Sequence, residues 1–148
     1  MSKTANLIFI IGLLAVVFFF ATYDLTESPH TWYDEGAIIQ RAITFLRYGT
    51  MHYQVAPGQF SSAAFDSTGY PVIYPISLVF KYFGIGLLQA RAVMVVFILL
   101  LVLTAYVLIK RMAGFYYAAA AALLLGTFPP LYGNGKNVLG EIPGLFFL

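Results

Sequence analysis

Residues 92–109 form an apolar stretch without a charged side chain, and this stretch constrains the fold more than any other feature of the sequence. A helix needs roughly 20 apolar residues to cross the hydrocarbon core of a bilayer. Similar stretches cover residues 7–22 and 113–131, and another begins at residue 142. Charged residues make up 9% of the chain, against about 25% in soluble domains, so lipid is the expected solvent.

These stretches predict an all-α, polytopic transmembrane helical bundle, with residues 1–148 forming the N-terminal part of one transmembrane domain. Three spans are expected at about 7–22, 92–109 and 113–131, and a fourth would start at 142. The sequence ends inside that last stretch, which indicates a fragment. The first stretch also fits a signal peptide, but its length and poor cleavage pattern favour an uncleaved span. Lys3 then places the N-terminus in the cytoplasm.

Residues 23–91 form the predicted outer loop, which holds both histidines and every acidic residue except Glu141. Within it, residues 36–48 have helical spacing, and Gly49 is a typical helix end. The pattern predicts an interfacial helix. Residues 55–69, which include Asp66, are rich in Pro, Gly and Ser and are expected to be loop. The expected helix has an apolar face of Ile38, Ala42, Phe45 and Leu46 opposite a polar face of Gln40, Arg41, Thr44 and Arg47.

Residues 71–88 are apolar but contain two prolines and Lys81, so they either span the bilayer or lie in its interface. If they span, Lys110 and Arg111 fall outside and Glu141 lies opposite the acidic loop. If they do not span, the basic pair is cytoplasmic and Glu141 shares the outer side with the loop. The second arrangement is favoured because cytoplasmic ends of spans are enriched in Lys and Arg. It also avoids a cost of about 2.5–3.5 kcal/mol for a lysine at the bilayer centre.

The favoured topology brings Asp34, Glu35 and Glu141 to one aqueous face beside the bilayer, where a cluster of carboxylates suggests function. The alternative for Asp34 and Glu35 is that they stabilise the start of a helix. The net charge of +2 is too small for a nucleic-acid surface. The chain has no cysteine, which excludes disulfides and thiolate chemistry.

A cytoplasmic N-terminus, a first span and a long outer loop opening with Asp-Glu resemble the GT-C superfold of glycosyltransferases. The closest likeness is to the branch of the protein O-mannosyltransferases and the aminoarabinose transferases of lipid A. The motifs that carry the resemblance are Trp32-Tyr33-Asp34-Glu35, Phe45-Leu46-Arg47-Tyr48-Gly49, Gly69-Tyr70-Pro71-Val72-Ile73-Tyr74-Pro75, Phe80-Lys81-Tyr82-Phe83-Gly84, Ala90-Arg91-Ala92, Lys110-Arg111 and Leu139-Gly140-Glu141-Ile142-Pro143.

The resemblance implies an enzyme of the membrane, in prokaryotes the plasma (inner) membrane, with its catalytic loop on the extracytoplasmic side. It would transfer a sugar from a polyprenyl- or dolichyl-phosphate donor to a hydroxyl of a protein, lipid or glycan. Asp34 would be the general base and Glu35 would orient it or the acceptor.

Further residues are candidates for holding the substrates of such a transfer. Arg91 and Lys81 would face the donor phosphate, since such a transfer needs positive charge there. Glu141 would bind the acceptor, and Trp32 and Tyr33 would stack on a sugar or anchor the loop at the lipid headgroups. A divalent cation (Mg²⁺ or Mn²⁺) at Asp34 and Glu141 is left open.

Two other classes of function remain open. A transporter or channel component would place acidic residues inside its spans, whereas the predicted spans are almost free of charge. A non-catalytic membrane subunit would use the outer loop to bind a partner protein.

Overall fold

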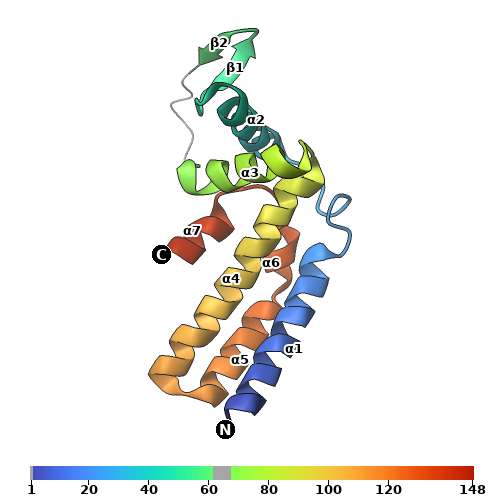
Figure 1. The fold of residues 1–148 in the computed structure, drawn as a ribbon. Helices are drawn as coiled ribbons and strands as arrows, with labels where there is room; N and C mark the ends of the chain where they lie inside the picture. The colour runs from blue at the N-terminus through green and yellow to red at the C-terminus, as the bar shows by residue number, and fades with distance from the viewer. Residues whose placement is uncertain (1, 62–67) are drawn as a thin grey trace.

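The computed structural model describes residues 2–61 and 68–148, and most of these are helical. Residues 62–67, and with them Asp66, lie outside the described residues. The helical bundle consists of α1 (Lys3–Thr22), α4 (Leu87–Ala113) and α5 (Phe115–Gly126), as Figure 1 shows. A smaller layer lies beyond one end of the bundle and contains α2 (Tyr33–Tyr48), α3 (Tyr70–Phe83) and a β-hairpin.

Two helices, α1 and α4, are long and apolar enough to cross a bilayer. They agree with the spans predicted at 7–22 and 92–109, and α4 extends beyond the predicted range at both ends. The predicted third span is not one continuous helix. Helix α5 ends at Gly126 and is about 18 Å long, and the short α6 (Pro129–Gly133) follows after a break. The break precedes Pro129-Pro130, a pair that the sequence analysis included in the span.

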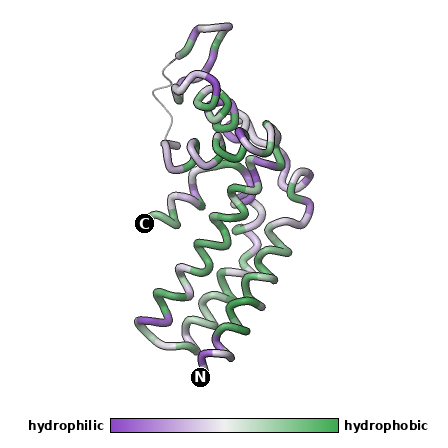
Figure 2. The backbone as a smooth tube through the Cα atoms, viewed as in Figure 1, coloured by the Kyte–Doolittle hydropathy of each residue, from purple (hydrophilic) through white to green (hydrophobic). Residues whose placement is uncertain are grey.

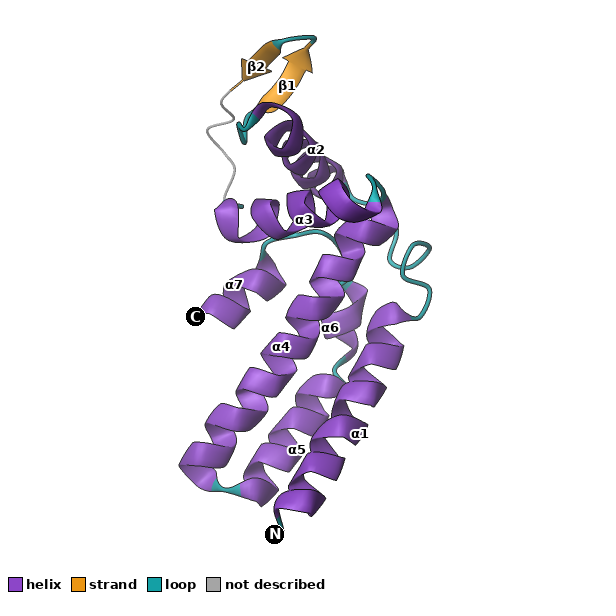
Figure 3. Cartoon of the chain, viewed as in Figure 1, coloured by secondary structure: helices purple, strands orange, loops and turns teal. Residues whose placement is uncertain are grey.

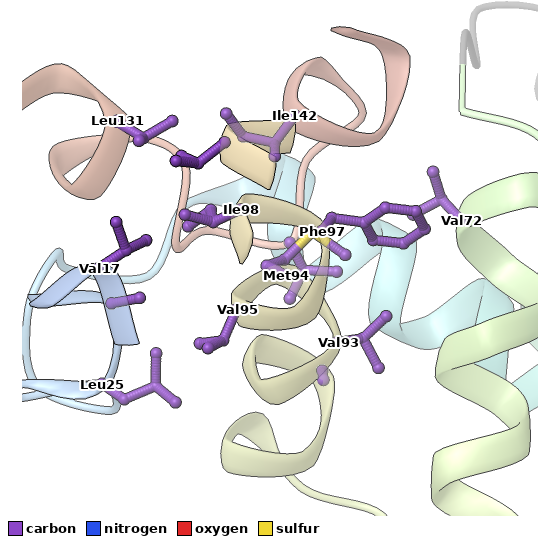
Figure 4. Packing of buried hydrophobic residues seen from close by; sticks show 14 of the residues in the cluster. Val17, Leu25, Val72, Val93, Met94, Val95, Phe97, Ile98, Leu131 and Ile142 are labelled. Carbon is purple, nitrogen blue, oxygen red and sulfur yellow. The ribbon is translucent and has the colours of Figure 1, made fainter. Parts of the chain in front are cut away.

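Helix α4 is the centre of the packing, because it contacts α1, α3, α5 and α7 (Glu141–Phe147). Figure 4 shows buried side chains of α4, including Met94 and Ile98, among residues of the neighbouring elements such as Val17 and Val72. Helix α1 approaches α5 closely at Gly126, where an added Cβ would lie 2.9 Å from Val17 Cγ2. A glycine is therefore required there for the two helices to pack at this distance.

Both ends of the bundle carry polar groups and the region between them is apolar, as Figure 2 shows. At one end, the Asn6 side chain accepts hydrogen bonds from Tyr106 and Lys110, which ties the start of α1 to the end of α4. The acidic residues of the described chain lie toward the other end. Helix α1 leaves many apolar side chains exposed, among them Leu7, Ile8, Ile11, Phe18 and Phe19, so this surface needs lipid or further protein against it.

Helix α3 runs across the end of α4 instead of alongside it (Figure 1) and is not among the helices long and apolar enough to span. This arrangement agrees with the favoured topology, in which residues 71–88 do not cross the bilayer. Pro71 lies in the first turn of α3, where a missing N–H is tolerated, and Gly84 ends the helix with a positive φ.

Helix α2 confirms the helix predicted at residues 36–48, which begins three residues earlier than expected and ends at Gly49 with a left-handed φ of 70°. One face was assigned wrongly. Arg41 was expected to point toward water, but it is buried and donates to Met51 O at 2.7 Å and Thr68 O at 2.6 Å. The apolar residues of α2 pack on α3. Through its bonds to Met51 and Thr68, Arg41 connects α2 to the chain before and after the hairpin.

The β-hairpin of β1 (Tyr53–Ala56) and β2 (Gln59–Ser61) was not predicted, because residues 55–69 read as loop. Figure 3 shows it as the only strand structure in the described chain. The strands are antiparallel and turn at Gly58, which has a φ of 75°. Gln40 on α2 donates to Gln54 O at 2.9 Å and fixes the hairpin to the helix.

Candidate functional site

A buried ion pair between Glu35 and Arg91 organises the acidic end of the molecule. Arg91 Nε donates to Glu35 Oε1 and Nη2 donates to Oε2, each at 2.8 Å, so the pair is bidentate. Both side chains are fully buried. Glu35 lies in the first turn of α2 and Arg91 near the start of α4, so the pair joins the outer layer to the bundle.

The ion pair is extended by two loop segments. Arg91 Nη1 donates to Leu25 O at 2.8 Å, and Nη2 also donates to Asn137 Oδ1 at 2.9 Å. The backbone N–H of Val138 donates to Glu35 Oε1 at 3.0 Å. We call the set of Glu35, Arg91, Leu25 O, Asn137 and Val138 N–H the Glu35–Arg91 node. It fixes the segment before α7 to the loop after α1.

Lys136 adds a second connection beside the node, because its Nζ donates to Tyr23 O at 2.6 Å. Burial lowers the pKa of Lys136 from the usual 10.5, an effect that the charge of Asp24 opposes and that of Arg91 reinforces. The loop between α6 and α7 is therefore held by polar contacts at Lys136, Asn137 and Val138.

The Glu35–Arg91 node changes two roles expected from the sequence. Glu35 was expected to orient Asp34 or the acceptor, but its carboxylate is buried against Arg91. Arg91 was expected to face a phosphate, but four of its five N–H groups donate within the node and its side chain is not exposed. Both residues position other groups and do not line the clefts described next.

Asp34 and Glu141 lie on the accessible side of this framework. Each is exposed, and the two residues, distant in sequence, line the same two clefts together with Leu139. Asp34 is in the first turn of α2, and Glu141 begins α7. The node holds both positions, because Glu35 is next to Asp34 and Val138 is three residues before Glu141.

The hairpin cleft has a volume of about 890 Å³ and lies between α2, the hairpin and the start of α7. Tyr33, which is 89% exposed, lies at its edge. Its lining consists of Tyr33, Asp34, Ala37, Ile38, Gln40, Tyr53, Gln54, Val55, Ser61, Thr68, Leu139, Gly140 and Glu141.

The Trp32 cleft has a volume of about 490 Å³ and lies between the start of α2 and helices α6 and α7. It is lined by Trp32, Asp34, Phe128, Pro130, Leu131, Asn134, Gly135, Asn137, Leu139, Glu141, Ile142 and Leu145. Asp34 and Glu141 therefore lie where a cleft with mixed polar and apolar walls meets one with mostly apolar walls.

No lysine or arginine of the described residues lines either cleft. Lys81, the second residue expected to face a phosphate, is exposed in the last turn of α3 and lies over the ring of Tyr82. The clefts around Asp34 and Glu141 are thus acidic and suit a neutral or cationic group better than an anion.

The described residues do not form a site of three carboxylates. Among residues 2–61 and 68–148, no group of three His, Cys, Asp or Glu side chains is placed to hold a metal ion. Glu35 is committed to Arg91, which leaves Asp34 and Glu141 as a pair. Of the three residues expected on one face, Asp34 and Glu141 line shared clefts, whereas Glu35 is buried and lines neither cleft.

Asn137 was not predicted as a site residue, and its place in the short polar run at residues 133–137 is its only signal in the sequence. Asn137 is 2% exposed, its oxygen accepts from Arg91, and its amide nitrogen has no hydrogen-bond partner among the described residues.

The chain matches no protein-family model, no curated protein and no solved structure.

Proposed function

We propose that the chain is the N-terminal part of a multi-pass membrane glycosyltransferase of the GT-C type. The intact protein would take a sugar from a polyprenyl- or dolichyl-phosphate donor and transfer it to a hydroxyl acceptor. In this proposal α1, α4 and α5 lie in the bilayer, and the layer of α2, α3 and the hairpin lies on the extracytoplasmic side. The end with Lys3, Lys110 and Arg111 is then cytoplasmic, as expected for basic residues that flank spans.

The observation that carries the proposal is the shared position of Asp34 and Glu141 on two adjoining clefts. A transfer reaction needs two substrates to meet at one catalytic group, and a carboxylate bordering two spaces meets that requirement. Asp34 accepts the proton of the acceptor hydroxyl as its oxygen attacks the anomeric carbon. The bond from that carbon to the lipid phosphate breaks, and the phosphate leaves with the electron pair.

The roles proposed for Glu35 and Arg91 follow from their burial, and the role of Glu141 follows from its exposure in the clefts. Glu35 and Arg91 are positioning residues, because they hold Asp34 and the segment before Glu141 without reaching a cleft. Glu141 binds the acceptor or the sugar beside Asp34. The cation that meets the donor phosphate lies outside the two clefts.

The test is sugar transfer by the intact enzyme with Asp34→Asn. Removal of a general base is expected to lower turnover about 10²–10⁴-fold while membrane insertion is unchanged. Asp24→Asn is a matched control, because Asp24 is exposed at the same end and lines neither cleft. Near-normal transfer by Asp34→Asn would remove Asp34 from the role of base.

A further inference from the structure

Asn137 has an unusual position beside the Trp32 cleft. Arg91 can only donate hydrogen bonds, so the atom of Asn137 at 2.9 Å from Arg91 Nη2 must be the oxygen, which fixes the orientation of the amide. The amide nitrogen then carries two N–H groups on the other side. Asn137 lines the Trp32 cleft, and this nitrogen is buried without a partner among the described residues.

A buried donor without a partner is unfavourable, and native proteins satisfy nearly all such groups. The amide of Asn137 cannot turn away without breaking its bond to Arg91. A ligand oxygen in the cleft is therefore a suitable acceptor for it. This is an observation independent of the two carboxylates, which alone would not define a site.

The other groups of the cleft restrict the chemistry of the ligand. Asp34 and Glu141 offer carboxylate oxygens that accept hydrogen bonds, so they suit hydroxyl groups. Trp32, which is 62% exposed, offers an aromatic face, and Leu131 and Ile142 form an apolar wall. A sugar ring carries hydroxyl groups that donate and accept, and C–H groups that pack on an aromatic ring. No described Lys or Arg lines the cleft, which disfavours an anionic sugar.

We propose that the Trp32 cleft is a binding site for a neutral sugar ring, in which Asn137 Nδ2 donates to a sugar oxygen, Asp34 and Glu141 accept from sugar hydroxyls, and Trp32 packs on the ring. The inference rests on the proposed function, since it identifies where one sugar of the transfer reaction lies. The sugar comes from either the lipid-linked donor or a glycan acceptor, which offer the same ring chemistry.

Trp32 is the single tryptophan of the chain, so its fluorescence reports on this cleft directly. The experiment titrates the 148-residue chain in lipid nanodiscs, free of glycoside detergents, with methyl glucoside, methyl mannoside and methyl xyloside. At least one should change the Trp32 emission saturably, and methyl glucuronide should bind more weakly because its carboxylate faces Asp34 and Glu141. A linear response, or none, to all three neutral glycosides would mean that an ordered water alone occupies the site, and would overturn the proposal.

Asn137→Asp is the sharpest variant, because it keeps the oxygen that accepts from Arg91 and replaces the N–H donor. It should weaken glycoside binding roughly ten-fold through loss of the hydrogen bond and added negative charge. Gln59→Glu makes the same change of an amide to a carboxylate on the exposed strand β2, outside both clefts, and should bind like the wild type. Equal binding by Asn137→Asp and the wild type would refute the role of Asn137. Asn137→Ser, which adds no charge, provides the same comparison if the aspartate variant does not fold.

The binding experiment needs no catalysis, so its outcome is separate from that of Asp34→Asn in the transfer assay. In the intact enzyme, the glycoside that binds should inhibit transfer in competition with either the lipid-linked donor or a glycan acceptor, and the competing substrate identifies the source of the sugar. Inhibition that competes with neither substrate would overturn the assignment to the transfer site.

Discussion

The Glu35–Arg91 node predicts that loss of either charge destabilises the folded chain strongly. Arg91→Met removes four hydrogen bonds and leaves the buried carboxylate of Glu35 with the N–H of Val138 as its remaining partner in the node. Breaking one side of a buried ion pair typically costs about 3–5 kcal/mol. Proteins are stable by about 5–15 kcal/mol, so this loss is a large fraction of the total.

Two further variants separate the charge from the geometry. Arg91→Lys retains a positive charge but cannot form the bidentate fork to both oxygens of Glu35, so an intermediate loss is expected. Glu35→Gln retains the shape of the side chain but leaves the buried guanidinium without a counter-charge, and the amide N–H₂ then faces a donor of Arg91. We expect its loss to be close to that of Arg91→Met.

The assay is chemical unfolding in nanodiscs, followed by the emission of Trp32, with Lys81→Met as the control. Lys81 is exposed and its only recorded contact in the described chain is with the Tyr82 ring, so this control should stay within about 0.5 kcal/mol of the wild type. An Arg91→Met chain within about 1 kcal/mol of the wild type would refute the reasoning, because a buried unpaired carboxylate cannot be that inexpensive.

The proposed membrane orientation predicts that single cysteines at Tyr33 and Glu141 react with an impermeant maleimide from one side of the membrane, and that a cysteine at Met112 reacts from the other side. Labelling of all three from the same side would contradict this orientation. Gly126→Leu should separate α1 from α5 and lower stability by about 1–3 kcal/mol, whereas Gly12→Leu, where an added Cβ meets nothing within 4 Å, should not. Because burial lowers the pKa of Lys136, the unfolded chain binds more protons between the lowered pKa and 10.5, so stability should rise with pH in that window. Lys136→Met should flatten this rise in pH-dependent unfolding curves, and an unchanged slope would contradict the assignment.

The helices α1, α2 and α4 could be predicted from the sequence because each has a local signal. Apolar length indicates α1 and α4, and helical spacing with a glycine end indicates α2. The break between α5 and α6 also had a signal in Pro129-Pro130, although alanine-rich sequence before it favoured a longer span. The hairpin had little signal, since three- and four-residue strands are too short to show a clear alternation.

Part of the candidate site could also be predicted from the sequence, and part of it could not. The position of Asp34 and Glu141 on a shared surface followed from the topology, which depends on charges that flank the apolar stretches. The burial of Glu35 could not be read from the sequence, because Asp34 and Glu35 are neighbours and only the ion pair with Arg91 on α4 decides which one faces inward. Arg91, Asn137 and Val138 are joined to Glu35 or to each other by contacts between residues far apart in the sequence. No local sequence pattern predicts such contacts.

The shortness of α5 has a consequence for the lipid around the protein. In the proposed orientation this helix, about 18 Å long, stands in a hydrocarbon layer about 30 Å thick, beside two neighbours that cross it fully. Lipids next to a short apolar segment compress to match it, which draws their headgroups toward the bilayer midplane on that flank. The missing length is on the side where α6 begins, next to the wall of the Trp32 cleft. A headgroup-linked sugar on this flank would therefore meet the protein below the average plane of the membrane surface.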